Sequence, residues 1–191
     1  MSRRSGRPLD RKLVMETAFV LLREEGLAAL SMRRLAQRLD VQAPAIYWHF
    51  ADKGELLGLM AANVYQDARD GVGQCADWRG WLFAYGSAFR RRLGREQDSA
   101  QLCAMAPPAP GGAPGSPGAI AAPLVELGLD QASALSAIAS VTSLALGWST
   151  FEANGPMHSF LEEMLDFDQS FEAGLRALVD GFQPLAGPAG V

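Results

Sequence analysis

The chain has 191 residues, 49 % of them hydrophobic and 20 % charged, which allows one large domain or a small domain joined to a larger one, with a core that needs no disulfides or metals. Two cysteines and two histidines are too few for a disulfide scaffold, and they nearly exclude a histidine-based zinc site or a Ser/His/Asp catalytic site. The net charge of −4 is divided unevenly: residues 1–55 carry ten Lys or Arg and seven Asp or Glu, whereas residues 56–191 carry seven and fourteen, so a basic part that contacts a polyanion is joined to an acidic body.

The N-terminal part predicts four helices, because apolar residues recur there at helical spacing. They are expected at residues 10–25, 32–39, 42–49 and 52–70. Asp10, Ser31 and Asp52 are plausible N-caps, and Glu55 completes a capping box with Asp52. Gly26 and Asp40 are expected to end the first two helices.

The rest of the chain also predicts helices, at residues 78–95, 99–105, 118–127, 130–152 and 167–182. Residues 106–118 contain only Ala, Pro, Gly and Ser, which predicts an irregular, mobile loop and excludes a membrane span in this charge-free stretch. Asn154, Gly155 and Pro156 predict a break. No segment has the alternation of a strand, and no secretory signal follows the basic start. We therefore expect an all-α fold.

Three short helices joined by tight turns on the basic side are typical of a helix-turn-helix unit. Arg33 lies in the second helix, and an Arg can neutralise phosphate or bind a guanine edge. Tyr47, Trp48 and His49 follow one another in the third helix, so they cannot all face inward. The alternative is that the aromatic residues only form the core of this unit, and for Phe50 we favour that alternative.

The stretch LSMRRLAQRLDVQAPAIYWHF at residues 30–50, followed by DKGELL at 52–57, resembles the DNA-binding domain of the tetracycline-repressor (TetR) family. The resemblance covers residues 9–57 and is strongest in the Tyr-Trp-His-Phe run and Lys53. Asp40 stands where the family often has glycine. Ala43 stands where the tetracycline repressor has a base-contacting glutamine, so a different operator is expected.

The resemblance implies that residues 42–49 enter the major groove and that Arg33 reaches a base edge. The implied DNA contacts are Arg33, Ala43, Pro44, Ala45, Tyr47, Trp48, His49 and Lys53. The alanines and the proline would meet thymine methyl groups, while Tyr47, His49 and Lys53 would hold phosphates. For Trp48, phosphate contact and packing both remain open. A flexible arm with Arg3, Arg4 and Arg7 could also reach the duplex, although charged termini are more often solvated.

A weaker resemblance in the second half implies a pocket for a small organic effector. The candidate residues are Tyr85, Phe89, Leu102, Cys103, Met105, Ile120, Ile138, Trp148 and Phe151. The alternative is that each of them fills the core. Cys103 stands at the position of the family's metal-binding histidine, so we expect no metal or other cofactor and an uncharged or weakly polar effector.

The family also implies a homodimer formed by the last two long helices. Small residues at 134, 137, 140, 145 and 147 suit close helix packing. An apolar stripe at 167, 171, 175, 178 and 182 could be only the chain's own core, but such a stripe usually serves both the core and a dimer, and the resemblance favours use in the dimer. We expect a helix-turn-helix DNA-binding domain at residues 1–57 and a helical effector-binding and dimerisation domain at 58–191.

The sequence thus predicts a cytoplasmic, sequence-specific transcriptional regulator. It would be a homodimeric repressor, released from a palindromic operator on double-stranded DNA by its effector, with no membrane partner. Two alternatives are an enzyme with an incidental basic N-terminus and an architectural DNA-binding protein without an effector. The enzyme is disfavoured because no titratable groups converge in the sequence.

Overall fold

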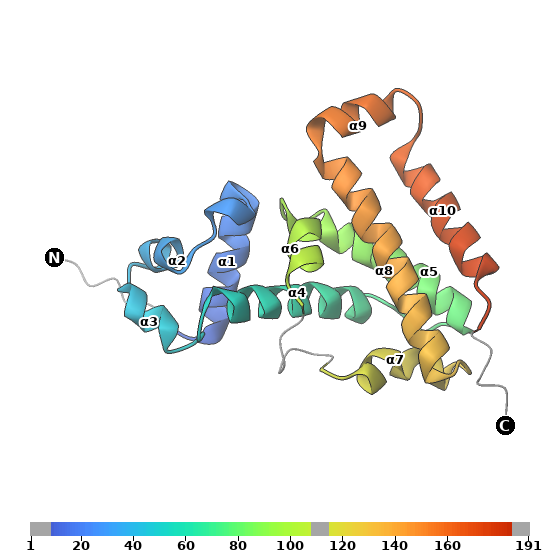
Figure 1. Ribbon diagram of the computed structural model, residues 1–191, viewed down its shortest axis with the longest axis horizontal. Helices are drawn as coiled ribbons and strands as arrows, with labels where there is room; N and C mark the ends of the chain where they lie inside the picture. Colours follow the sequence, from blue (N-terminus) through green and yellow to red (C-terminus); the bar gives the residue numbers. More distant parts are fainter. Residues whose placement is uncertain (1–8, 108–114, 185–191) are drawn as a thin grey trace.

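Helices account for all the regular secondary structure that the computed structural model describes, in residues 9–107 and 115–184 (Figure 1). The head comprises residues 9–57. It contains α1 (Arg11–Glu25), the 3-10 helix η1 (Leu27–Ala29), α2 (Met32–Leu39), α3 (Ala43–Tyr47) and the start of α4 (Lys53–Asp70). The body comprises the remaining described residues. It contains the rest of α4 and α5 (Trp78–Leu93), α6 (Ser99–Met105), α7 (Pro117–Glu126), α8 (Gln131–Ala153), α9 (Gly155–Glu162) and α10 (Phe167–Gly181).

The expected caps set the helix starts in the head. Asp10 Oδ1 accepts from Leu13 N at 2.7 Å, and Asp52 Oδ1 accepts from Glu55 N at 2.8 Å. Glu55 in turn accepts from the amide of Ala51, one residue before the cap. Asp40 ends α2 in the left-handed conformation at φ 55°, which Asp tolerates better than most residues. The turn between α2 and α3 is therefore closed without a glycine.

α5 lies at the centre of the body, between α4, α8 and α10. Gly86 allows the close approach, because a Cβ at this position would lie 2.7 Å from Val141 Cγ1 and 2.9 Å from the Leu175 methyl groups. Any larger residue would push α8 and α10 away from α5. The close packing of these three helices therefore depends on one missing side chain.

α7 contains an internal proline, and the structure compensates for it from α4. Pro123 has no N–H to donate to the carbonyl of Ala119 one turn earlier. Arg69 Nη2 donates to that carbonyl at 3.0 Å, and Nη1 donates to the Ile120 carbonyl at 2.9 Å. Arg69 thus fastens the first turn of α7 to the end of α4.

The structure corrects one expectation about the C-terminal helices and shows how the apolar stripe of α10 packs within one chain. The sequence at 154–156 was expected only to break the chain, but it also begins a helix, α9. Asn154 Oδ1 accepts from Met157 N at 3.1 Å and caps this helix. The apolar stripe of α10 faces the chain's own core, because Phe171 and Leu175 are buried, as are Ala134, Ala137 and Ala145 of α8. Phe167, Leu178 and Phe182 of the same stripe are only half-buried within one chain.

Three helix ends also differ from the expected ones. α3 ends at Tyr47, and Trp48 and His49 lie in the turn that follows. α5 ends at Leu93, two residues early, and α7 begins at Pro117 with Ser116 as its cap. Part of the expected loop, residues 108–114, lies outside the described residues.

One helix, α8, is long and apolar enough to cross a membrane by length and composition alone. A core helix of a soluble protein passes the same test, and α8 packs against α5, α6, α7 and α10. This helix therefore gives only weak support for a membrane span.

The α4–α7 contact can be tested with a double-mutant cycle on Arg69 and Pro123. Arg69→Met should lower the free energy of unfolding by about 1 kcal/mol, because the Ala119 carbonyl loses its donor. In a Pro123→Ala background the residue at 123 supplies that donor, so the same change should cost at least about 0.5 kcal/mol less. Urea unfolding of the four proteins measures the coupling, and strictly additive costs would contradict the assignment.

Candidate nucleic-acid interface and its connection to the body

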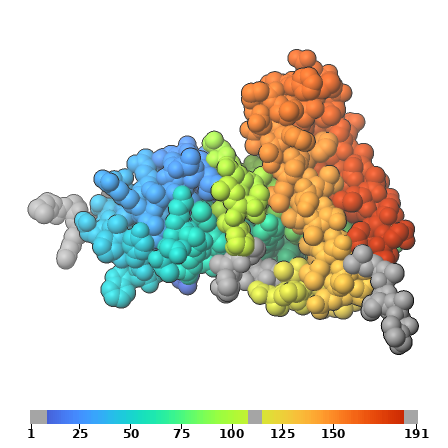
Figure 2. Space-filling model, in the orientation of Figure 1, coloured from blue at the N-terminus to red at the C-terminus, as the bar shows by residue number. Residues whose placement is uncertain are grey.

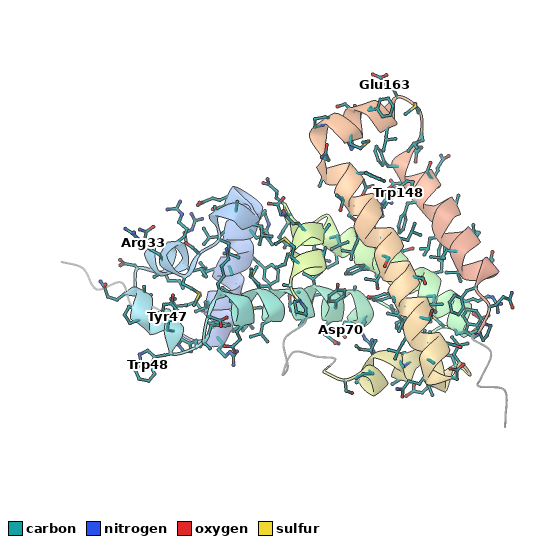
Figure 3. All side chains as sticks on the ribbon, in the orientation of Figure 1. Arg33, Tyr47, Trp48, Asp70, Trp148 and Glu163 are labelled. Atoms are coloured by element: carbon teal, nitrogen blue, oxygen red, sulfur yellow. The ribbon has the colours of Figure 1, made fainter. Side chains whose placement is uncertain are left out.

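The head presents an aromatic and basic surface at the end farthest from the body (Figure 3). Trp48 is 89 % exposed and Tyr47 is 52 % exposed, whereas Phe50 is 1 % exposed. Phe50 is therefore a core residue, whereas Tyr47 and Trp48 face solvent. An exposed Trp beside an exposed Tyr leaves apolar surface uncovered, which marks a contact surface.

Two of the three arginines of α2 form ion pairs with glutamates of α1. Arg34 Nε and Nη2 donate to the two carboxylate oxygens of Glu25 at 3.0 and 2.7 Å. This hydrogen-bonded pair lowers the pKa of Glu25 and raises that of Arg34. Arg38 is paired with Glu24. Both pairs fasten α2 to α1.

Arg33 differs from its neighbours, because it is exposed and forms no ion pair within the described residues. Lys53, at the first position of α4, is also exposed, and it forms no ion pair with any residue that the structure describes. These two side chains are therefore available to an external anion.

The remaining candidates of the DNA-contact set lie on α3 and the turn after it. Pro44 is exposed, Ala43 and Ala45 are half-buried, and His49 is half-buried in the turn. Ile46 points the opposite way and is buried in the head core. Seven of the eight candidates thus lie on α2, α3 and the turn after it, whereas Lys53 at the start of α4 also lines a pocket that includes residues of the body. The basic arm with Arg3, Arg4 and Arg7 lies outside the described residues.

Four aromatic rings stack in series inside the body. Tyr65 stacks on Phe89, Phe89 on Tyr85, and Tyr85 on Trp81, with ring centroids 5.1, 5.8 and 5.2 Å apart. Three of the rings lie four residues apart on α5, on one face of the helix. Arg69 lies over the Trp81 ring at 5.9 Å. We call these four rings the aromatic ladder.

Few polar groups accompany the aromatic ladder. The Tyr65 hydroxyl donates to the Cys103 carbonyl at 3.2 Å, and the Tyr85 and Thr142 hydroxyls are 3.4 Å apart. Burial raises the pKa of both tyrosines. Burial also raises the pKa of the Cys103 thiol to about 12, so this thiol stays protonated at neutral pH.

The structure separates the predicted effector residues into a group at the aromatic ladder, a group beside the head and three residues at other positions on α8. Tyr85, Phe89 and Cys103 lie in or against the aromatic ladder, with Ile120 reached through Arg69. Leu102 and Met105 line a pocket beside the head. Trp148 packs on Phe167 and Phe171 of α10 instead, Phe151 is exposed at the end of α8, and Ile138 is buried on α8.

Three residues of this region were missing from the candidate set. Tyr65 and Thr142 supply hydroxyls at the aromatic ladder, and Arg69 supplies a positive charge near Tyr85. Helical spacing on α4 could have placed Tyr65 and Arg69 on one face. The described residues hold no group of three His, Cys, Asp or Glu that could bind a metal ion.

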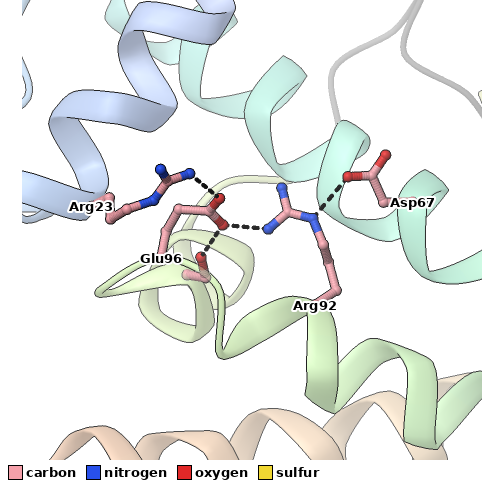
Figure 4. A network of polar contacts seen from close by, with 5 residues as sticks. Arg23, Asp67, Arg92 and Glu96 are labelled. Atoms are coloured by element: carbon pink, nitrogen blue, oxygen red, sulfur yellow. Dashed lines mark hydrogen bonds and ion pairs between the residues drawn. The ribbon is translucent and has the colours of Figure 1, made fainter.

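A network of ion pairs connects the head to the body (Figure 4). Arg92 of α5 pairs with Glu96 in the turn before α6, and its Nε donates to Asp67 of α4 at 2.8 Å. Arg23 of α1 reaches the same Glu96 at 3.4 Å. The Arg92 and Glu96 side chains are only 6 % and 5 % exposed. α1, α4, α5 and the α5–α6 turn are thus joined through one buried carboxylate.

A second contact lies beside this network. Asp98 Oδ2 accepts from Leu27 N of η1 at 2.8 Å. Gly26 makes room for it, because a Cβ there would lie 2.8 Å from the same oxygen, and its φ of 78° suits glycine. Asp98 itself adopts the left-handed conformation at φ 61°. The start of α6 is therefore fixed to the main chain of the head.

Glu96→Gln tests the network. The change removes one of the two carboxylates that pair with the buried Arg92 and leaves Asp67 as the other. The free energy of unfolding should therefore fall by about 3 kcal/mol. Glu24→Gln, which removes the exposed partner of Arg38, should cost no more than about 1 kcal/mol. Urea unfolding at one fixed protein concentration compares them, and equal costs would contradict a structural role for the buried pair.

The sequence of this chain is similar to a known protein family and to individual proteins. Residues 14–60 match the model of the bacterial regulatory proteins of the tetR family. The chain is 31 % identical to tetracycline repressor protein class A from transposon 1721 of Escherichia coli over 200 residues, covering 91 % of this chain and 90 % of that protein.

Solved structures agree with the sequence comparison. A variant of TetR from Acinetobacter baumannii AYE in complex with minocycline superposes with a TM-score of 0.75 at 30 % identity, covering 91 % of this chain and 96 % of that one. BioQ with its natural double-stranded DNA operator superposes with a TM-score of 0.70 at 31 % identity, covering 91 % and 98 %.

Proposed function

Because this chain belongs to the TetR family of bacterial transcriptional regulators, we propose that it represses transcription as a homodimer bound to a palindromic operator and leaves the DNA when a small organic effector binds. It is a regulator and not an enzyme. We assign operator binding to residues 1–57, effector binding and dimerisation to residues 58–191, and the protein to the cytoplasm. The two parts share α4, which runs through the division.

One observation carries the DNA-binding part of this proposal. Arg33 is the exposed arginine of α2 that forms no ion pair within the described residues, and it lies at the same end of the head as Tyr47 and Trp48 (Figure 3). An unpaired guanidinium can form two hydrogen bonds with guanine O6 and N7. We assign base contact to Arg33 and phosphate contact to Tyr47, His49 and Lys53. Pro44 and the two alanines of α3 provide apolar contact.

The operator contact requires two copies. One helix-turn-helix unit contacts only a short half-site, so useful affinity needs two units whose α3 helices lie about 34–36 Å apart, or a multiple of that distance. Ala139, Ser143 and Gly147 leave an exposed strip of small residues on α8. Because the apolar side of α10 is used inside the chain, we place this strip of α8 in the dimer.

The effector region centres on the aromatic ladder. Its stacked rings and the hydroxyls of Tyr65, Tyr85 and Thr142 suit a flat molecule with one or two hydrogen-bonding groups. The donor set does not suit magnesium, which prefers oxygen ligands and water. Cys103 is a buried, protonated thiol, so it cannot replace a histidine or a carboxylate there.

The connection between the two parts gives the effector a route to the DNA. Cys103 lies on α6, whose start is fixed to η1 through Asp98 and Leu27. A ligand that binds better to an arrangement in which α6 has shifted would move the head with it. The ligand then releases DNA only by as much as its affinities for the two arrangements differ.

The DNA contacts are tested with single substitutions. Arg33→Ala should cost about 1–3 kcal/mol of operator binding and relax specificity at one base pair, while Lys53→Ala should weaken all sequences alike and reduce the salt slope by about 1. Arg34→Ala is the matched control, because its guanidinium is already bound to Glu25. Titrations of labelled operator at several salt concentrations measure these effects. Arg33→Ala with parental affinity would refute the base contact.

The dimer is tested by sedimentation at low micromolar concentration, where we expect twice the mass of one chain. Gly147→Arg should weaken the dimer at least tenfold, because the new side chain would enter the partner. Gly73→Arg should have no effect, although both glycines have open space around the position of a Cβ within one chain. A single species with the mass of one chain would contradict the proposal.

The absence of a metal requirement is tested by calorimetry with tetracycline and Mg²⁺. We expect no tight Mg²⁺-dependent binding, because the region offers a thiol where the metal needs a nitrogen or oxygen ligand. Adding EDTA provides the control. Tight binding that EDTA abolishes, or release of operator DNA by the complex, would show that the effector region has been misassigned.

A further inference from the structure

A pocket of about 320 Å³ lies at the junction of the head and the body. We call it the junction pocket. Leu27 of η1 and Leu57 of α4 form its head side, and Leu102 and Met105 of α6 form its body side. Met105 is 68 % exposed, so the pocket presents uncovered apolar surface. Figure 2 shows α6 on this face, between the head and the body. Its volume is at the lower end for small-molecule sites.

The junction pocket is lined by one ammonium group and one carboxylate, whose formal charges cancel. Lys53 lines it and has no carboxylate within ion-pair distance in the described part of the chain. Asp98 also lines it, but its Oδ2 already accepts the Leu27 amide. A ligand would therefore meet an ammonium group without a partner in the described residues, and a carboxylate that stays negatively charged but is held in place by the Leu27 amide. Gln101 adds an uncharged amide.

We propose that the junction pocket binds a small amphipathic organic anion, with an apolar chain of about seven carbons and one carboxylate, a size in keeping with a pocket at the lower end of the range for small molecules. The apolar body would lie against Leu57, Leu102 and Met105, and the carboxylate would pair with Lys53. This site is separate from the aromatic ladder, because none of the four ladder rings is among the described residues that line the pocket.

Binding at the junction pocket has a consequence that rests on the proposed function. Lys53 would be shared between two anions, the ligand carboxylate and a DNA phosphate. A carboxylate that occupies Lys53 removes one phosphate contact, and an apolar body between η1 and α6 holds the head in one orientation. The ligand and the operator therefore compete.

The chain offers a direct test, because Lys12 and Lys53 are its two lysines. Reductive methylation with ¹³C-formaldehyde labels both while preserving their charge. Octanoate is then titrated without DNA and the two dimethyl-lysine signals are followed by NMR. Octan-1-ol and octylammonium have the same chain length without the negative charge. We expect the Lys53 signal to shift with octanoate. The Lys12 signal should stay in place, because Lys12 pairs with Glu16 on the exposed surface of α1 and does not line the pocket.

Substitutions separate the pocket from non-specific binding. Ala28→Phe fills the pocket from an exposed position of η1 and should abolish the shift. By calorimetry, Lys53→Gln should weaken octanoate binding about two- to fivefold, the range for an exposed ion pair, and Lys12→Gln should not change it. No Lys53 shift, a shift that survives Ala28→Phe, or an equal shift with octylammonium would overturn the proposal.

A second arm measures competition with operator DNA. Octanoate should lower operator affinity in the parent and not in Ala28→Phe. If the chain binds octanoate in the pocket but binds no operator, the site stands and the proposed function fails. If it binds operator without any octanoate shift, the site fails and the proposed function stands.

Discussion

The buried ion pair between Arg92 and Glu96 is the contact on which the arrangement of head and body depends. A charged pair this deep is costly to desolvate, so each partner needs further hydrogen bonds. Asp67 supplies one for Arg92, and Arg23 and Ser99 lie against Glu96. These groups come from α4, α1 and α6, so the charges can only be satisfied when all three helices are in place. A change in the position of α6 must therefore rearrange this network or move the head.

The charge distribution of the sequence overstates what the head presents to its surroundings. The excess of three positive charges in residues 1–55 indicates a polyanion partner. In the structure, however, several of these cations form ion pairs within the chain. Arg11, Arg34 and Arg38 each bind a glutamate of the head, and Arg23 binds Glu96 of the body. In the described part of the head, the cations left for an external anion are few and lie at defined points. Specific contacts, rather than a broad positive field, are what such a surface favours.

Local signals made the fold predictable from the sequence, whereas contacts between distant residues did not. Caps such as Asp10, Ser31 and Asp52 act within one turn, and their hydrogen bonds form as expected. α9 was missed because Asn154 and Pro156 were interpreted as a break, although Asn is also a cap and Pro is tolerated in the first turn. The direction of the apolar side of α10 was left open, because periodicity identifies an apolar face but not what covers it.

The same difference between local signals and long-range contacts explains which parts of the candidate sites were predictable. The DNA-contact residues follow one another on short helices, so a local motif brings them to one surface, and their roles remain predictions. The effector candidates come from four helices, and only tertiary packing decides their neighbours. Met105 and Trp148 were grouped with Tyr85 by their apolar character, and the structure places them beside the head and against α10. Arg69 was left out of the candidate set because the helix that it stabilises, with the missing N–H of Pro123, lies about 50 residues away in the chain, at residue 123.

The exposure of Trp48 gives the protein a spectroscopic property of its own. Of its four tryptophans, Trp81 is buried and Trp78 and Trp148 are half-buried, whereas Trp48 is almost fully open to water. Its emission therefore belongs at the red edge of the spectrum, and collisional quenchers reach it first. A molecule that covers α3 shields this one indole, so iodide quenching distinguishes events on that surface from events inside the body without any added label.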